Sequence, residues 1–125
     1  MVRPEYDGRI FRSMSNTANG EVGADTRFSY TQTGNVVQGT YAGGRILSGV
    51  LIAIADGDGA LNMRYAHVTD GGELMTGTCR STPEVLRDGR IRLHERWRWT
   101  SGDGSTGESV IEEVPSEARR PGTSG

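Results

Sequence analysis

The stretch Arg90-Ile-Arg-Leu-His-Glu-Arg-Trp-Arg-Trp99 alternates between two kinds of side chain. Every second residue from Arg90 onward is arginine or histidine, and the residues between them are apolar except for Glu95. This period of two fits a β-strand, whose successive side chains point to opposite faces of a sheet, and it does not fit a helix. The stretch therefore predicts a strand with a basic outer face and an aromatic inner face that carries one carboxylate.

Short runs of the same kind fill most of the chain and are separated by glycine-rich turns. Dipeptides such as Gly34-Asn35 and Gly43-Gly44 favour hairpins, because their positive φ angles match the twist of the flanking strands. No segment carries the 3.6-residue apolar period of a helix. Eight strands are expected, over residues 8–14, 26–33, 36–42, 45–55, 60–70, 73–87, 90–100 and 106–114.

A row of eight hairpin-linked strands leaves two unpaired edges, and closing the sheet into a barrel hides both of them. We therefore predict an all-β fold, an eight-stranded antiparallel up-and-down β-barrel; a β-sandwich would need longer crossing connections. The barrel domain is expected over residues 8–114, between a flexible N-terminus (1–7) and a disordered C-terminal tail (115–125). The polar loop 15–25 is either a functional loop or a solvated connection.

The composition excludes several classes of function. All fourteen basic residues are arginine, which rules out lysine Schiff-base chemistry and a P-loop lysine. The net charge of −2 gives no global attraction for nucleic acid or for an anionic membrane. The single Cys79 permits no internal disulfide, and neither histidine shares a strand face with the other, so no metal and no cofactor are expected. The lack of a leader and of a long apolar run leads us to expect a cytoplasmic protein.

Short turns fix the register of neighbouring strands, so the inward-facing side chains can be followed from strand to strand. The expected aliphatic interior consists of Ile46, Val50, Ile52, Ile54, Leu61, Met63 and Leu93. Two registers are possible for the strand over residues 73–87. In one of them Arg80 and the residues two positions away from it point inward, and in the other they point outward. Two-residue turns point Thr78 and Arg80 into the barrel, whereas three-residue turns point Gly77 and Cys79 there; the turn sequences favour the first.

The arginine row of the opening stretch has two interpretations. It could be a stripe for anions or nucleic acid, or a solvated outer face that discourages edge pairing. We favour the solvated face, because Glu108 and Glu112 on the next strand can lie opposite Arg98 and His94.

Aromatic side chains are expected to gather at one level of the interior, where they favour a ligand pocket over a completely filled core. Arg80 and Glu95 would be the only interior charges, so they should pair or contact the polar head of a ligand. We predict a binding site for a hydrophobic small molecule, with or without one acidic or polar head. Its expected residues are Arg80, Trp97, Trp99, Tyr65, Tyr41, Tyr30 and Thr78.

Two other functions remain open. The same interior could belong to a cofactor-free cyclase or isomerase of a hydrophobic intermediate, with Glu95, His67 and Tyr65 as catalytic residues. The barrel could also be a structural or partner-binding domain with a filled lumen. A homodimer is compatible with each of these functions.

Three stretches, residues 8–12, 15–21 and 77–103, resemble a family of small bacterial proteins that often carry the name N-acetylglutamate synthase. An acetyltransferase of that kind needs an α/β fold and a Gly-rich turn that opens a helix. This sequence contains no such turn, so we do not expect that activity. The resemblance implies an architecture similar to avidin-like and lipocalin-like (calycin) barrels, which by itself carries little about function.

Overall fold

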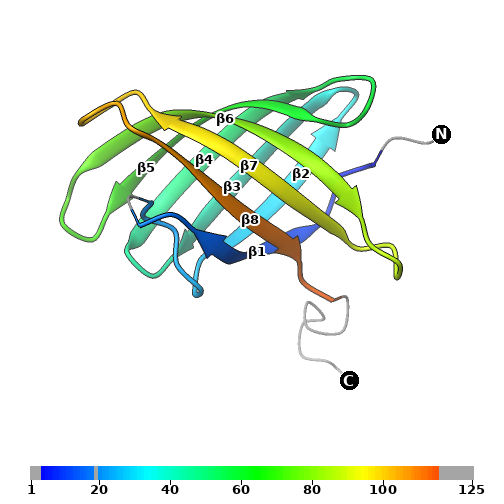
Figure 1. Ribbon diagram of the computed structural model, residues 1–125, viewed down its shortest axis with the longest axis horizontal. Helices are drawn as coiled ribbons and strands as arrows, with labels where there is room; N and C mark the ends of the chain where they lie inside the picture. Colours follow the sequence, from blue (N-terminus) through cyan, green and yellow to red (C-terminus); the bar gives the residue numbers. More distant parts are fainter. Residues whose placement is uncertain (1–3, 19, 116–125) are drawn as a thin grey trace.

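In a computed structural model, eight antiparallel strands close into a barrel in which each strand pairs with its neighbours in sequence and β1 pairs with β8 (Figure 1). The structure describes residues 4–18 and 20–115, and these contain no helix. The predicted barrel is therefore confirmed. The strands are β1 (Ile10–Asn16), β2 (Arg27–Thr33), β3 (Val36–Gly43), β4 (Ile46–Ala55), β5 (Leu61–Thr69), β6 (Leu74–Val85), β7 (Ile91–Trp99) and β8 (Thr106–Glu113).

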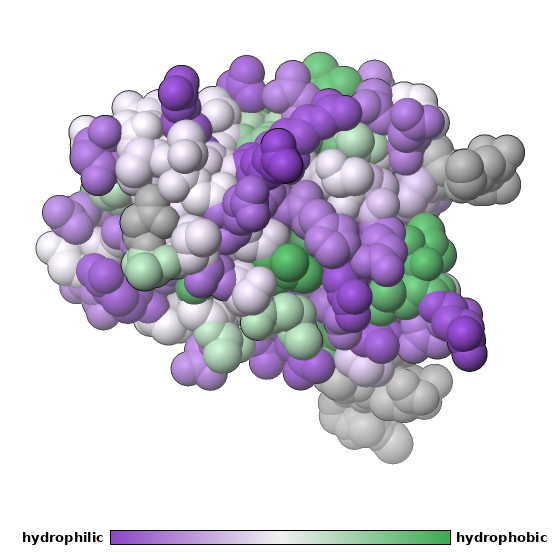
Figure 2. All heavy atoms as spheres, viewed as in Figure 1, coloured by the Kyte–Doolittle hydropathy of each residue, from purple (hydrophilic) through white to green (hydrophobic). Residues whose placement is uncertain are grey.

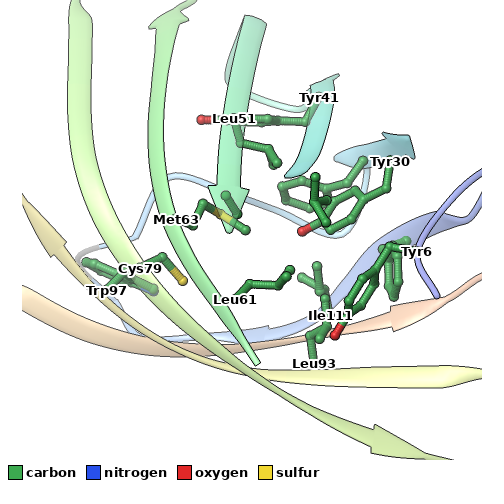
Figure 3. Packing of buried hydrophobic residues seen from close by; sticks show 14 of the residues in the cluster. Tyr6, Tyr30, Tyr41, Leu51, Leu61, Met63, Cys79, Leu93, Trp97 and Ile111 are labelled. Atoms are coloured by element: carbon green, nitrogen blue, oxygen red, sulfur yellow. The ribbon is translucent and has the colours of Figure 1, made fainter. Parts of the chain in front are cut away.

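The N-terminal segment closes one end of the barrel. Tyr6 is fully buried, its hydroxyl donates a hydrogen bond to the carbonyl of Gly59, and its ring packs near Tyr30 (Figure 3). The segment that was expected to be a flexible N-terminus, residues 1–7, thus contains a ring packed in the core, and its burial offsets part of the chain entropy lost in ordering the segment. Residues 1–3 and residues 116–125 of the expected tail lie outside the described residues.

A bulge near the start of β4 breaks the predicted register. The pairing of β2 with β3 is as predicted, with Phe28 opposite Tyr41. In the next pair, however, Tyr41 lies opposite Gly49 rather than Ile46, and Gly43 takes the place opposite Ile46. Between these two pairs β4 has two residues, Leu47 and Ser48, where β3 has only Ala42. This extra residue reverses the facing of every later residue on β4, because side chains alternate along a strand.

The prediction of an aliphatic interior was consequently wrong for most of β4. Leu51 and Ala53 point into the barrel, and Val50, Ile52 and Ile54 lie on the outer face with 55, 50 and 58 % of their surface exposed. The expected inward face of β5 is nevertheless correct, since the connection between β4 and β5 is a five-residue loop (residues 56–60) instead of the expected four. The extra residue in β4 and the extra residue in the loop cancel, so β5 keeps its predicted facing.

The second of the two registers considered for β6 is the one that forms. Three-residue turns flank the strand, with the amide of Thr69 bonded to the carbonyl of Glu73 and that of Leu86 bonded to Arg90. Gly77 and Cys79 therefore face inward. The predicted lumen positions of Thr78 and Arg80 are wrong: both side chains point outward, and Arg80 pairs with Asp56 at 3.0 Å.

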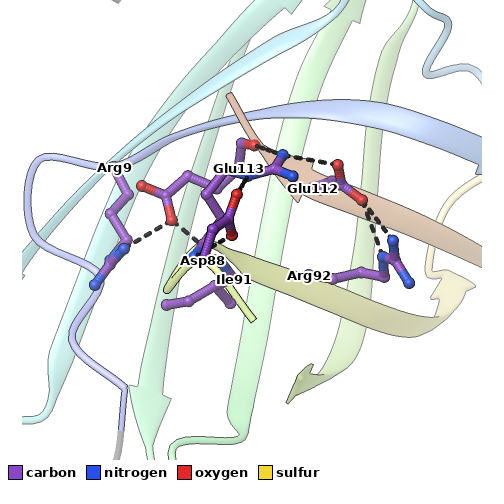
Figure 4. Close-up of polar contacts among 7 residues, drawn as sticks. Arg9, Asp88, Ile91, Arg92, Glu112 and Glu113 are labelled. Atoms are coloured by element: carbon purple, nitrogen blue, oxygen red, sulfur yellow. Dashed lines mark hydrogen bonds and ion pairs between the residues drawn. The ribbon is translucent and has the colours of Figure 1, made fainter. Parts of the chain in front are cut away.

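The arginine row lies on the outer face of β7, as predicted, but its partners on β8 differ by two residues. Arg92 lies opposite Glu112 and Arg96 opposite Glu108. Glu112 is nearly buried, and it accepts hydrogen bonds from Arg92 at 2.8 Å and from Arg90 at 2.9 Å (Figure 4). These bonds tie β8 to the start of β7, one strand away from the seam at which the barrel closes.

Glu113, the next residue along β8, bonds to the N-terminal segment, which lies on the other side of that seam. Glu113 receives a guanidinium bond of 2.7 Å from Arg9 and a backbone bond of 3.1 Å from the amide of Ile91. The two carboxylates thus connect the N-terminal segment, β7 and β8.

Replacing Glu112 with glutamine is expected to lower the free energy of unfolding by about 1–2 kcal/mol at neutral pH, because it removes two charge-assisted hydrogen bonds whose arginines are partly solvated. Burial alone would raise the pKa of Glu112, but the bonds from Arg92 and Arg90 outweigh it and hold the pKa below its usual value. The carboxylate therefore stabilises the fold above the pKa of the unfolded chain, and this contribution disappears as pH falls through the lowered native pKa.

Urea unfolding of Glu112→Gln between acidic and neutral pH measures this contribution. Glu108→Gln is the matched control, because Glu108 approaches Arg96 only at 3.7 Å and both side chains are mostly exposed. Equal losses in the two variants would contradict the assigned role of Glu112.

Candidate functional site

A cavity of about 60 Å³ lies inside the barrel, toward the end at which the β1–β2 loop crosses the opening. Six of its sixteen lining residues are phenylalanine, tyrosine or tryptophan, and the remaining lining includes one carboxylate of the barrel and part of the loop. The lining residues are Asn16, Gly20, Glu21, Val22, Phe28, Tyr30, Tyr41, Leu51, Met63, Tyr65, His67, Cys79, Glu95, Trp97, Trp99 and Ser109.

The structure brings together all five aromatic residues that the sequence predicted for the site. The rings form a continuous wall: the centroids of Trp97 and Trp99 are 5.5 Å apart, and those of Tyr65 and Trp99 are 5.8 Å apart. On the other side Tyr41 stacks on Phe28 at 5.0 Å. Edge-to-face and offset pairs at these distances hold the rings in fixed orientations.

Glycines on the neighbouring strands make room for these rings. Tyr41 lies opposite Gly49, and a Cβ atom on that glycine would come within 2.5 Å of the ring. The same relation holds between Trp97 and Gly107, where the distance would be 2.3 Å. Tyr65 likewise covers Gly77. The aromatic side chains therefore lie flat along the wall instead of filling the centre.

Glu95 is the carboxylate of this wall. Its two oxygens accept hydrogen bonds from the hydroxyls of Ser81 at 2.9 Å and Ser109 at 3.0 Å. Burial raises the pKa of Glu95 from 4.5 to about 7, against the opposing effect of the two serine bonds. The expected interior pair with Arg80 does not exist, and no cation of the described residues bonds to this carboxylate.

His67 is buried and bonds through both ring nitrogens. Its Nδ1 lies 2.9 Å from the hydroxyl of Tyr41, and its Nε2 lies 2.7 Å from a carboxylate oxygen of Glu21. The predicted acid/base partner Tyr65 instead stacks on the imidazole with 6.4 Å between ring centroids. Glu95 bonds to the serines and makes no hydrogen bond to His67 in the part of the chain that the structure describes.

Sequence reasoning missed Glu21. The only signal was the length of the polar loop 15–25, because nothing in the local pattern indicates which loop side chain reaches the interior. The loop is held by a hydrogen bond of 3.1 Å from the amide group of Asn16 to the carbonyl of Val22. A Cβ atom on Gly20 would come within 2.2 Å of that amide group, so a side chain there would displace the Asn16 amide from its bond to Val22.

Two polar atoms of the cavity wall lack a hydrogen-bond partner among the described residues. They are the hydroxyl oxygen of Tyr30 and the side-chain carbonyl oxygen of Asn16. Tyr30 is only 1 % exposed, and its hydroxyl points into the barrel (Figure 3). Burial, followed by the nearby Glu95 carboxylate, raises the pKa of this phenol well above its usual value, so it remains a proton donor.

The described residues contain no cluster of three histidine, cysteine or carboxylate side chains that could hold a metal ion. Within the same residues, no helix has the length and apolar character that a membrane span requires.

A family model described as avidin-like protein matches residues 4–114. Searches among curated proteins and among solved structures find no match. The match covers all eight strands and every residue of the cavity wall. This chain belongs to the avidin-like protein family.

Proposed function

We propose that the protein binds a small molecule inside the barrel, with an apolar body against the aromatic wall and a polar head beside Glu95 and Tyr30. The observation that carries this proposal is the buried hydroxyl of Tyr30, which has no partner among the described residues. An unsatisfied buried donor is costly, and a bound ligand would supply the missing acceptor.

The charges of the cavity favour a neutral head. Arg80, the one cation that could have received an acidic head, lies outside the barrel. Glu95 would repel a carboxylate when ionised but accepts N–H groups in the same state. Tyr30 can donate to a carbonyl oxygen at the same time. A head that both donates and accepts, such as a primary amide, therefore suits the site better than a carboxylic acid.

The ligand must displace part of the β1–β2 loop. A volume of about 60 Å³ corresponds to roughly four water positions at about 15 Å³ each, less than a small aromatic molecule needs. Glu21 and Val22 line this cavity from the loop, and the bond from Glu21 to His67 holds the loop against the barrel. Breaking that bond would open the mouth without disturbing the strands.

Titrating the protein with hydrophobic primary amides, and with the matching carboxylic acids, tests this function. The emission of Trp97 and Trp99, the only two tryptophans, reports binding because both line the cavity. We expect the amides to bind more tightly than the acids at about pH 8, where Glu95 is mostly ionised. Tyr30→Phe should weaken amide binding at least about tenfold, since it removes a hydrogen-bond donor and keeps the ring.

Tyr6→Phe is the matched control, because the Tyr6 hydroxyl bonds to Gly59 at the closed end of the barrel. It should leave the affinity unchanged. If no compound alters the emission, the interior is a packed core and the barrel has a structural role. If Tyr30→Phe binds amides as well as the parent protein does, Tyr30 does not hold the polar head and the proposed site is wrong.

An enzyme is the second candidate, favoured by the pKa of Glu95 at about 7. A carboxyl group that titrates near neutral pH can act as a general acid or base, as a cyclase or isomerase would require. His67 and Tyr65 line the same cavity and could orient the substrate. Conversion of a bound compound that is lost in Glu95→Gln, while binding is retained, would distinguish this enzyme from a simple binding protein.

A further inference from the structure

Four arginines line a shallow groove on the outer face of β5, β6 and β7. They are Arg64, Arg80, Arg96 and Arg98, and the only acidic residue of the groove lining is Glu108. The strand register arranges them in two rows: Arg64 and Arg98 flank Thr78 in the first. In the second, Arg80 lies directly opposite Arg96. Figure 2 shows a band of hydrophilic side chains that crosses this face of the barrel.

This arrangement is electrostatically unfavourable in the free protein. Like charges directly opposite on neighbouring strands destabilise a sheet, and Arg80 and Arg96 have that relation. Asp56 pairs with Arg80 at 3.0 Å, and Glu108 approaches Arg96 only at 3.7 Å, with both of these side chains mostly exposed. The counter-charges therefore leave an excess of positive charge in the groove.

The first row has no acidic partner in the described structure. The guanidinium of Arg64 donates to the side-chain oxygen of Asn62 and to the carbonyl of Met63, both neutral acceptors. Arg98 makes no ion pair within the described residues. The other end of the same strand is different, because Arg92 is bound at 2.8 Å by Glu112.

We propose that this groove binds a compact oxyanion with at least two negative charges, such as the diphosphate group of a small molecule. Guanidinium groups present several planar donors each and are suited to phosphate oxygens. The four arginines span three neighbouring strands, and their two rows lie two residues apart along the strands. These spacings define a patch of about 10 by 7 Å, which matches the size of a small anionic group. An extended polyanion needs a far larger surface, and Asp56 and Glu108 border this one.

The proposed anion site does not depend on the proposed cavity ligand. The arginines of the groove lie on the outer face of the barrel wall and Tyr30 lies in the cavity on the inner face, although Cys79 and Trp97 line both. The anion can therefore bind in Tyr30→Phe, and an amide can bind in variants of the groove.

Inorganic pyrophosphate is the probe. We expect it to raise the midpoint of thermal unfolding more than sodium chloride of the same ionic strength, and calorimetric titration to give saturable binding. Arg64→Gln and Arg98→Gln should each weaken pyrophosphate binding at least about tenfold, because each removes a charged donor from the anion. Both side chains lie on the surface, so the folds of the variants should remain intact, as near-ultraviolet dichroism of the tryptophans can verify.

Arg45→Gln is the control, since it removes the same charge from the turn before β4, where Arg45 is 58 % exposed and approaches Asp70 at 3.6 Å. It should leave the affinity for pyrophosphate unchanged. The proposal is overturned if sodium chloride stabilises the protein as much as pyrophosphate, or if Arg45→Gln weakens binding as much as Arg98→Gln. A single-stranded oligonucleotide that binds more tightly than pyrophosphate would overturn it in favour of a nucleic-acid surface.

Discussion

Glu95→Gln is expected to stabilise the protein at about pH 8 by up to about 3 kcal/mol and to change its stability little near pH 4. Burial raises the pKa of Glu95 from 4.5 to about 7, so the folded protein holds this carboxyl group in its neutral form more strongly than the unfolded chain does. Glutamine is neutral at every pH, and its side chain can still bond to Ser81 and Ser109.

The sign of the effect follows from proton binding. Between the two pKa values the native state keeps the proton and the unfolded state has lost it, so the contribution of Glu95 to stability falls as pH rises. Below about pH 4 both states hold the proton and Glu95 contributes no pH dependence; above the native pKa the full penalty of a buried anion is present. The variant removes that penalty.

Urea unfolding of the parent and the variant across this pH range measures the effect. Glu108→Gln provides the control, because Glu108 is 70 % exposed and its removal should shift the unfolding curve nearly equally at all these pH values. A loss of stability in Glu95→Gln at alkaline pH would contradict the burial argument. The predicted gain would support the proposed function, because a carboxylate that destabilises the fold is expected where function retains it.

Gly43→Ala is expected to lower the free energy of unfolding by about 3 kcal/mol, through backbone strain and a steric clash at the end of β3. Gly43 has a φ angle of +121°, and a Cβ atom there would lie 2.1 Å from the carbonyl oxygen of Asp25. The backbone must shift to avoid this contact. The shift would also disturb Thr26, whose hydroxyl donates to the carbonyl of Gly43 at 3.1 Å.

Gly34→Ala separates strain from clash. Gly34 also has a positive φ angle, +61°, but an added Cβ atom would meet no atom within 4 Å. This variant should lower the free energy of unfolding by only about 1 kcal/mol, the strain of the left-handed conformation alone. Chemical denaturation of the two variants measures the difference, and equal losses would show that the backbone at Gly43 tolerates a side chain.

The sequence by itself determined the eight strands, the closed barrel and the aromatic wall. These features follow from local signals: alternation within each strand, such as that around Trp97, and glycine turns between strands. The inward face of β7 could be predicted from this strand alone, because the two faces of the strand differ so strongly in polarity. That contrast also located Glu95 in the wall and the arginine row outside.

Tertiary structure alone decided which side of β4 and β6 faces the interior. One residue more or less in a turn reverses a whole strand, and the strand over residues 74–85 has plausible side chains on both faces. The backbone at Gly43 depends on a close approach by Asp25, and the position of Glu21 depends on its bond to His67 across the barrel. Such contacts join segments far apart in sequence, so no local pattern encodes them; the bond of Tyr6 to Gly59 is another of this kind.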